Sequence, residues 1–322
     1  MPLHLRRRSL FACLAALGLS ACGRGGAKPL RFGAHPWPGY QLLYLARDQG
    51  YLPAAVQLVE TPSSSASLRS LANGTLDGAA LTLDEVITAR SRGLNLRVVA
   101  VVDVSLGADV VLAREGITRP QQLRGRRVGV EPSATAAVML DAFLRVNGMD
   151  LTELKLVELT VDEHVAAYRS HRVDAVVTYA PASNLLRRDG AVQLFSSAQV
   201  PGRIVDVLAV QADRLDACAQ GIRALVHGHF TALAAWRADP SPALAAMAQS
   251  LHIEPAELAA VLKELELPDA AANHSWLATD VGRLNESARM LSRVMRSAGL
   301  LPEQVDGPDL SLLVDDHFLP AT

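Results

Sequence analysis

The chain has 322 residues, of which 50% are hydrophobic and 20% are charged, and its formal net charge is −2 at pH 7. This length and composition are those of a large globular protein with a sizeable core, and they exclude a chain dominated by low-complexity sequence. The sequence has no basic stripe for a nucleic acid and no Lys-rich amphipathic helix for a membrane surface, so neither contact is expected from charge.

The N-terminal segment predicts export from the cytoplasm. Arg6, Arg7 and Arg8 precede an apolar run over residues 10–19, and a basic stretch followed by a short apolar one is typical of a secretory signal peptide. The run is too short for a transmembrane helix, which needs roughly 20 apolar residues. We expect residues 1–21 to be removed, which shifts the formal net charge from −2 to −5 because three arginines leave. Arg7 and Arg8 also fit twin-arginine export, so the export route stays open.

The end of this segment, Leu19-Ser20-Ala21-Cys22, resembles the lipobox of bacterial lipoproteins. The resemblance implies that Cys22 carries lipid, palmitate included, and becomes the mature N-terminus. Residues 22–28 then form a short flexible linker to the folded part. We expect the protein on the periplasmic side of a bacterial membrane, attached by its lipid alone, with inner and outer membrane both open.

The cysteines predict no disulfide. Cys13 leaves with the signal peptide and Cys22 is lipidated, so Cys218 is the remaining thiol of the mature chain. Cys218 lies in an apolar helical pattern without an activating neighbour, which favours a buried small side chain over a nucleophile.

From residue 30 the chain alternates short β-rich runs with helical stretches that end at Gly or Asn. The expected strands are residues 30–34, 56–60, 78–81 and 96–104, and the expected helices are residues 40–48, 67–72 and 85–91. Strands separated by helices predict βαβ units and a mainly parallel sheet.

The pattern restarts after Arg124-Gly125, which predicts a second lobe. Its expected strands are residues 127–130, 155–159 and 174–178, and its expected helices are residues 134–147 and 162–170. Residues 73–81 also align with residues 170–178, because in both a helix ends, a turn follows and an acid precedes an apolar strand. We interpret these acids, Asp77 and Asp174, as turn or cap residues rather than as chemistry.

The rest of the chain is expected to return to the first lobe. A strand is predicted at residues 205–210, followed by helices at residues 213–238, 242–251, 255–265 and 285–298. Crossings near residues 108–112 and 204–206 would form a hinge. The predicted fold class is therefore α/β, with two lobes, each a mainly parallel sheet flanked by helices, and a cleft between them. The first lobe is expected to comprise residues 29–110 and 206–322, and the second residues 111–205.

Ligands of open parallel sheets bind beyond the carboxyl ends of the strands, and this rule selects the candidate site. Trp37 and Tyr40 follow the first strand on a Pro and Gly turn, where they either wall a pocket or pack on the lobe's own surface. Residues 63–67 place serines at the start of a helix, which suits either an anion or a simple N-cap. Thr82 and Asp84 follow the third strand and could both cap a helix and face the cleft.

The second lobe repeats this arrangement. A strand ends at Glu131 with hydroxyls at the next helix start, and Tyr179 ends another strand. At the second crossing, Arg203 and Asp206 either hold a ligand or pair with each other. The candidate ligand-binding residues are Trp37, Tyr40, Ser64, Ser65, Thr82, Asp84, Asp109, Glu131, Ser133, Thr135, Tyr179, Arg203 and Asp206.

The charge of the ligand stays open. The hydroxyl-rich helix starts and Arg203 favour an anionic group such as a sulfonate or carboxylate, whereas Asp84, Asp109, Glu131 and Asp206 favour an amine. A zwitterion or an aromatic ring that bears an amine satisfies both sets.

No catalytic or metal site is predicted. His227 and His229 point to different helix faces, and His164 and His171 are expected to face solvent. Asp315-Asp316-His317 falls in a predicted tail, and no Gly-rich phosphate loop or serine elbow is present. We therefore expect a binding protein without cofactor, metal or catalytic residue.

Four features of this sequence occur together in one known family. They are the lipobox, Trp37-Pro38-Gly39-Tyr40, Leu83-Asp84-Glu85 and Gly129-Val130-Glu131-Pro132-Ser133. Over residues 30–210 the chain resembles the solute-binding components of ABC transporters in the nitrate, sulfonate and taurine group, with relatives that bind thiamine-precursor pyrimidines. The resemblance implies the class II periplasmic-binding fold and a monomer that holds a small polar organic solute in its cleft. It also implies delivery of that solute to an ABC permease.

Two alternatives remain open. The lipoprotein could present its ligand to a membrane-bound sensor protein, since both roles need the same closed, liganded surface. An enzyme of the same fold acting on a pyrimidine-like substrate is also conceivable, because a fold does not fix a function, although export argues against it.

Overall fold

The computed structural model describes residues 28–279, 282–301 and 310–321. The predicted signal peptide, Cys13 and the lipidation site Cys22 lie outside these residues. Among the helices of the described part, none is both long and apolar enough to span a bilayer.

The first lobe is built on a six-stranded sheet in the order β11-β4-β10-β3-β1-β2. Its strands are β1 (Leu30–Ala34), β2 (Val56–Glu60), β3 (Gly78–Thr82), β4 (Leu96–Ser105), β10 (Val205–Gln211) and β11 (Leu265–Glu266). β1 pairs in parallel with β2 and β3, whereas β10 runs antiparallel between β3 and β4. Helices cover both faces of this sheet, so its central strands are continuous apolar runs.

The second lobe is built on a five-stranded sheet in the order β7-β6-β8-β5-β9. Its strands are β5 (Val110–Ala113), β6 (Arg127–Val130), β7 (Lys155–Glu158), β8 (Ala175–Thr178) and β9 (Val192–Ser196). β6 pairs in parallel with β7 and β8, whereas β5 runs antiparallel between β8 and β9. The chain therefore passes between the two sheets twice, from β4 to β5 and from β9 to β10.

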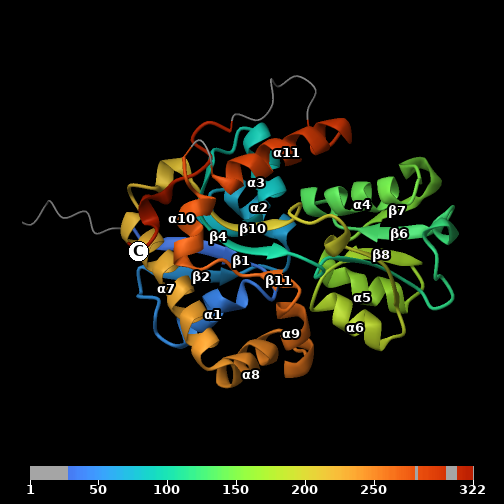
Figure 1. The fold of residues 1–322 in the computed structure, drawn as a ribbon, viewed down its shortest axis with the longest axis horizontal. Coiled ribbons are helices and arrows are strands. Elements are labelled where there is room, and N and C mark those ends of the chain that lie inside the picture. The colour runs from blue at the N-terminus through green and yellow to red at the C-terminus, as the bar shows by residue number, and fades with distance from the viewer. Residues whose placement is uncertain (1–27, 280–281, 302–309, 322) are drawn as a thin grey trace, which may run out of the picture.

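Helices flank both sheets, and Figure 1 shows the two lobes side by side, with the second lobe on the right. The helices are α1 (Gln41–Asp48), α2 (Ser64–Ala72), α3 (Leu83–Ser91), α4 (Ala134–Val146), α5 (Val161–Arg169), α6 (Ala182–Arg188), α7 (Ala219–Ala238), α8 (Pro240–Ser250), α9 (Pro255–Leu262), α10 (Ala270–Trp276) and α11 (Arg283–Ser297). α3 of the first lobe packs against α4 of the second, and Val86, Ile87, Met139 and Phe143 belong to one hydrophobic cluster that is continuous across the lobes. The structure is therefore a closed one, with the lobes in contact.

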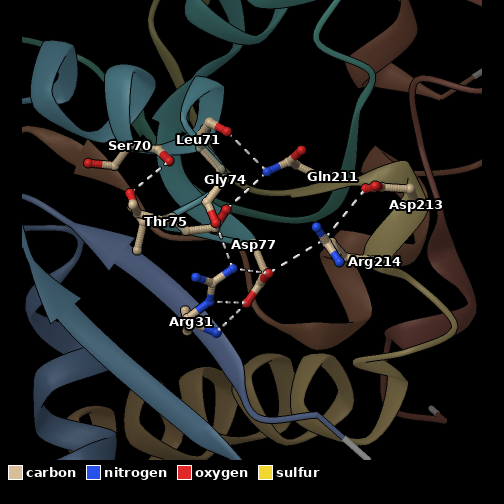
Figure 2. Close-up of polar contacts among 10 residues, drawn as sticks. Arg31, Ser70, Leu71, Gly74, Thr75, Asp77, Gln211, Asp213 and Arg214 are labelled. Carbon is tan, nitrogen blue, oxygen red and sulfur yellow. Dashed lines mark hydrogen bonds and ion pairs between the residues drawn. The ribbon is translucent and has the colours of Figure 1, made fainter.

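The two lobes share one contact, between an arginine and an aspartate, at the amino ends of their strands. The backbone N–H of Arg31, on β1, donates to Asp77 over 2.9 Å, and its guanidinium binds the same carboxylate (Figure 2). The backbone N–H of Arg127, on β6, donates to Asp174 over 2.9 Å in the same way. In each lobe the acid precedes a strand paired in parallel with that of the arginine, so the alignment predicted between the halves is structural. The acids are not helix caps; they join two strands.

Most element boundaries predicted from the sequence agree with the structure to within two residues, and the exceptions have local causes. α2 begins at Ser64 rather than Ser67, because the Ser63 hydroxyl caps the helix by accepting from the N–H of Ala66. The helix expected from residue 213 begins at Ala219, after a 3-10 turn (Ala212–Arg214). The helix expected up to residue 265 ends at Leu262, and β11 follows. β5, β9, α6 and α10 were not predicted, since each has at most seven residues and shows little periodicity.

One expectation about a single residue was wrong, and the predicted C-terminal tail is part of the folded first lobe. His164 is buried, with 1% of its surface exposed, and binds Thr178 instead of facing solvent. The predicted tail packs on the first lobe, where Val314 bridges to Val98 and Phe318 is buried. Cys218 is buried and unpaired as expected, and His227 is exposed whereas His229 is buried, on different faces of α7 as expected.

Candidate functional site

A buried cavity lies between the two lobes, at one edge of both sheets. β1, β2, β3, β6 and β8 end here, and their following residues, such as Trp37 and Glu131, line the cavity. β5 and β10 run antiparallel to these strands, so their amino ends bring Asp109 and Asp206 to the same edge. The cavity encloses about 30 Å³, room for about two water molecules, which agrees with closed lobes.

The aromatic turn after β1 is fixed by carboxylates of the sheet. The indole N–H of Trp37 donates to Oδ2 of Asp103 over 3.0 Å, and the hydroxyl of Tyr40 donates to Asp206. A Cβ on Gly39 would lie 1.8 Å from Oδ2 of Asp103, so only glycine lets the turn lie against that carboxylate. Held in this way, the Trp37 ring packs edge-on against Tyr179 of the second lobe, with 5.4 Å between ring centroids.

The serine-rich start of α2 is occupied by groups of the protein itself. The hydroxyl of Ser63 accepts from the N–H of Ala66, and the N–H of Ser65 points to Oε1 of Glu131 at 3.5 Å. Both expectations for this segment are partly met. One serine caps the helix, and a carboxyl group lies at the helix N-terminus, but it belongs to Glu131 of the other lobe and not to a ligand.

Hydroxyl groups also join the lobes. Oγ1 of Thr82 and Oγ1 of Thr135 lie 2.6 Å apart, one from each lobe. Thr82 begins α3 in a capping box, in which its backbone N–H donates to Oε2 of Glu85 over 3.1 Å. Ser133 caps α4 by accepting from the N–H of Ala136. These hydroxyls therefore both start helices and line the cavity.

The cavity is surrounded by carboxyl groups. Glu85, Asp109, Glu131 and Asp206 line it, and Asp84 and Asp103 lie buried beside them. Burial raises the pKa of all six, to about 7 for Asp109 and to about 8 for Glu85, where the neighbouring charge of Asp84 adds to the effect. A carboxyl group removed from water favours its neutral form, and nearby carboxylates favour it further.

The two histidines of the cavity stay neutral at ordinary pH. Burial lowers the pKa of His35 to about 3 and that of His164 to about 4. His35 packs edge-on against Tyr40, with 5.1 Å between ring centroids. They therefore act as hydrogen-bonding and aromatic walls, without positive charge.

The structure brings most of the predicted site residues together. The cavity is lined by nine of them: Trp37, Ser64, Thr82, Asp109, Glu131, Ser133, Thr135, Tyr179 and Asp206. The other four, Tyr40, Ser65, Asp84 and Arg203, do not line it. Tyr40 and Ser65 support lining residues, and in the described part of the chain no ion pair joins Arg203 to Asp206, whose partner is Tyr40.

Eight lining residues were not predicted: His35, Glu85, Ala136, Met139, His164, Val177, Thr178 and Ile204. His35 and Thr178 stand at strand ends, so the rule that selected their neighbours could have found them. Asp103, which holds Trp37, is a lone acid in the apolar run of β4, and an acid in that position signals a special role. Met139 and Ile204 carried no signal, since apolar side chains of this kind also fill cores.

Comparisons with known proteins agree with this architecture. Over 238 aligned residues, the chain is 24% identical to the taurine-binding periplasmic protein of Escherichia coli (strain K12). The alignment covers 73% of this chain and 73% of that protein. The solved structure of the alkanesulfonate-binding protein SsuA from Xanthomonas axonopodis pv. citri, bound to MOPS, has a TM-score of 0.74 at 18% identity, covering 90% of this chain and 99% of that one. The periplasmic nitrate-binding protein NrtA from Synechocystis PCC 6803 has a TM-score of 0.71 at 12% identity, covering 90% and 87%.

These likenesses confirm the predicted two-lobed α/β fold and the resemblance to the nitrate, sulfonate and taurine group. The relatives are binding proteins rather than enzymes, as expected for this chain. A family model described as NMT1/THI5 like matches residues 37–243, more than half of the chain. The protein therefore belongs to the NMT1/THI5-like family.

Proposed function

We propose that this protein is the exported solute-binding component of an ABC importer, which holds a small polar organic solute between its lobes and delivers it to a permease. The observation that carries the proposal is the buried polar cavity at the shared strand ends, in a family whose relatives are periplasmic binding proteins. Polar side chains converge on it among aromatic and apolar ones such as Trp37, Met139 and Ile204, and such convergent polar groups orient a small ligand.

The two passages of chain between the sheets act as the hinge in this proposal. Residues 29–110 with 206–322 form one lobe and residues 111–205 the other. Contacts between the lobes, such as Thr82 with Thr135 and Arg188 with Glu257, hold the closed form. The cavity has room for about two water molecules, so a solute enters an open form, and the lobes then close around it on a wider cleft than the present one.

The protein is anchored on the periplasmic side of the membrane through lipid on Cys22 in this proposal. The motif Leu19-Ser20-Ala21-Cys22 after a signal-like segment supports it. Labelled palmitate should be incorporated into the wild-type protein and not into Cys22→Ser, which should be recovered in the soluble fraction. Equal labelling of both proteins would exclude this anchor.

The binding role is tested by heating the mature protein with candidate solutes. A solute that binds only the folded state raises stability by about 2.7 kcal/mol at 100 times its dissociation constant. We expect a rise in Tm with at least one compound from a panel of alkanesulfonates, nitrate, amino acids, amines and polar heterocycles. Mass spectrometry of the solute released from the denatured protein should identify the same compound. If no compound binds and none is released, the binding role is wrong.

A further inference from the structure

The charge of the cavity is strongly one-sided. Glu85, Asp109, Glu131 and Asp206 line it from four different segments, and no Lys or Arg is among its lining residues. Each of these four side chains is at most 4% exposed. Burying carboxyl groups without a cation costs free energy, so a protein that keeps four in one cavity must compensate for them elsewhere or by what it binds.

The compensation within the protein is incomplete. Oε1 of Glu85 and Oδ2 of Asp109 are buried with no hydrogen-bond partner, and so is Oδ1 of Asp103 behind the cavity wall. Trp37 donates to Asp103 and Tyr40 donates to Asp206. The hydroxyls of Tyr179 and Ser65 and Nη1 of Arg203 are buried without a partner, but none of them bonds these oxygens. An ionised carboxylate only accepts hydrogen bonds. The lining of the cavity thus holds neutral donors such as Tyr179 and no positively charged one.

The helix starts where an anion could sit are partly occupied by groups of the protein itself. The helix start at Ser65 faces the Glu131 carboxylate, and the start of α4 is capped by the Ser133 hydroxyl. A sulfonate bound here would also lie among four carboxyl groups, and each of them that is ionised repels it at close range. The serine-rich turns thus offer an anion fewer free N–H groups than their sequence suggests.

The walls suit a flat group. The ring centroid of Tyr179 lies 5.4 Å from that of Trp37 and 5.8 Å from that of His35. Aromatic faces attract cations as well as other rings. We propose, resting on the function proposed above, that the solute carries a cationic nitrogen group, such as a protonated amine or an amidine, on a small flat or apolar body, and that the cleft rejects sulfonates.

Proton release should accompany binding. The titratable groups that face the cavity or support its wall are the carboxyls of Asp84, Glu85, Asp103, Asp109, Glu131 and Asp206, the hydroxyls of Tyr40 and Tyr179, and the rings of His35 and His164. Burial keeps the histidines and tyrosines neutral between pH 6 and 8, whereas it brings the pKa of Asp109 to about 7 and that of Glu85 to about 8. A cation favours the ionised carboxylates, so these groups lose protons when it binds and its affinity rises with pH.

The class of solute is tested with probes that differ only in charge. Benzyl and butyl skeletons are each offered to the mature protein as the amine, as the neutral amide or alcohol, and as the sulfonate. The phenyl skeleton is offered as the amidine, the neutral amide and the sulfonate, and taurine is added to the panel. We expect a rise in Tm with cationic members alone, and a higher affinity at pH 8 than at pH 6. Binding of a sulfonate or of taurine with no cationic binder overturns the inference and leaves the binding role standing. If no member binds at millimolar concentration, the inference fails, and the broader screen above then decides the binding role.

Variants assign the effect to the cavity. Glu85→Gln keeps an oxygen for the N–H of Thr82, and Asp109→Asn keeps the shape of the side chain; the matched controls are Glu158→Gln and Asp216→Asn, whose side chains are exposed. We expect each cavity variant to bind the cationic probe at least tenfold more weakly and to release fewer protons, measured by calorimetry in two buffers of different ionisation enthalpy. The controls should match wild type. Unchanged affinity in both cavity variants, with Tm values that show folded protein, contradicts the inference.

Discussion

At the scale of single residues, the aromatic turn and the carboxyl cluster depend on each other. Trp37 and Tyr40 donate to carboxylates that have no cation beside them, and Gly39 lets the turn lie against Asp103. Each donor–acceptor pair satisfies one buried polar group with another, which reduces the cost of placing acids in an apolar sheet.

Gly39→Ala tests how closely this turn must approach the sheet. The new Cβ would fall 1.8 Å from Oδ2 of Asp103, so the turn or the carboxylate must move and the Trp37 hydrogen bond is lost. Forcing an extra carbon into a packed site costs about 1–3 kcal/mol. We expect a lower urea midpoint and weaker binding of any solute that stabilises the wild type. An unchanged midpoint would mean that the turn relaxes freely.

The buried carboxyls predict the pH dependence of the ligand-free protein. Their folded pKa values are raised above the unfolded ones, to about 8 for Glu85 and about 7 for Asp109, so the folded state holds more protons in this range. The stabilisation that these raised pKa values give the folded state is therefore complete below about pH 4 and is lost as the pH rises toward 8. We expect the free energy of unfolding in urea to fall between pH 5 and pH 8, and to fall less in Glu85→Gln. The same slope in both proteins would contradict this assignment.

At the scale of elements, each lobe begins its parallel sheet with an arginine and an acid on neighbouring chain segments. Asp77 accepts from the backbone and side chain of Arg31, and Arg214 approaches the same carboxylate at 3.6 Å (Figure 2). In the second lobe, the only ion pair of Asp174 among the described residues is with Arg127. These contacts lie at the edge of the sheets away from the cavity, so they support the fold without contacting a solute.

Asp77→Ala leaves a backbone N–H of β1 without its acceptor and removes a carboxylate partner from Arg31 and from Arg214, which keep Gly74 and Asp213. Loss of a buried acceptor costs about 1–3 kcal/mol, and we expect that decrease in the free energy of unfolding. Asp174→Ala should act in the same direction but less strongly, because one arginine is involved. The Asp77 carboxyl has a lowered pKa through Arg31 and its backbone N–H, against burial, so this contribution should be lost as pH falls below about 4. Equal unfolding of Asp77→Ala and wild type would contradict the prediction.

At the scale of the whole molecule, closure is held by contacts at the rim and inside the cleft. The guanidinium of Arg188 on α6 binds Glu257 on α9, so the pair joins the two lobes. Both side chains are partly exposed, and surface ion pairs contribute little in water.

Reversal of one charge, in Arg188→Glu, should favour the open form and weaken solute binding by no more than a few-fold. The double variant Arg188→Glu with Glu257→Arg should restore affinity. The readouts are titration calorimetry and the radius of gyration of the ligand-free protein in solution. A tenfold loss that the double variant does not rescue would show that the pair does more than join the rims.

The order of elements, the repeat of the two halves and the sheet edge where the candidate site lies could all be predicted from the sequence. Strand ends such as those before Trp37, Glu131 and Tyr179 are visible from local patterns, because alternation of β-rich and helical runs is a property of nearby residues. Three contacts became visible in the folded chain: Glu85 and His164 face the cavity, Asp103 accepts from Trp37, and Glu131 reaches the helix start at Ser65. These contacts join residues that are distant in sequence. Their burial and their charge depend on how the two lobes close on each other, and a local sequence pattern does not encode that arrangement.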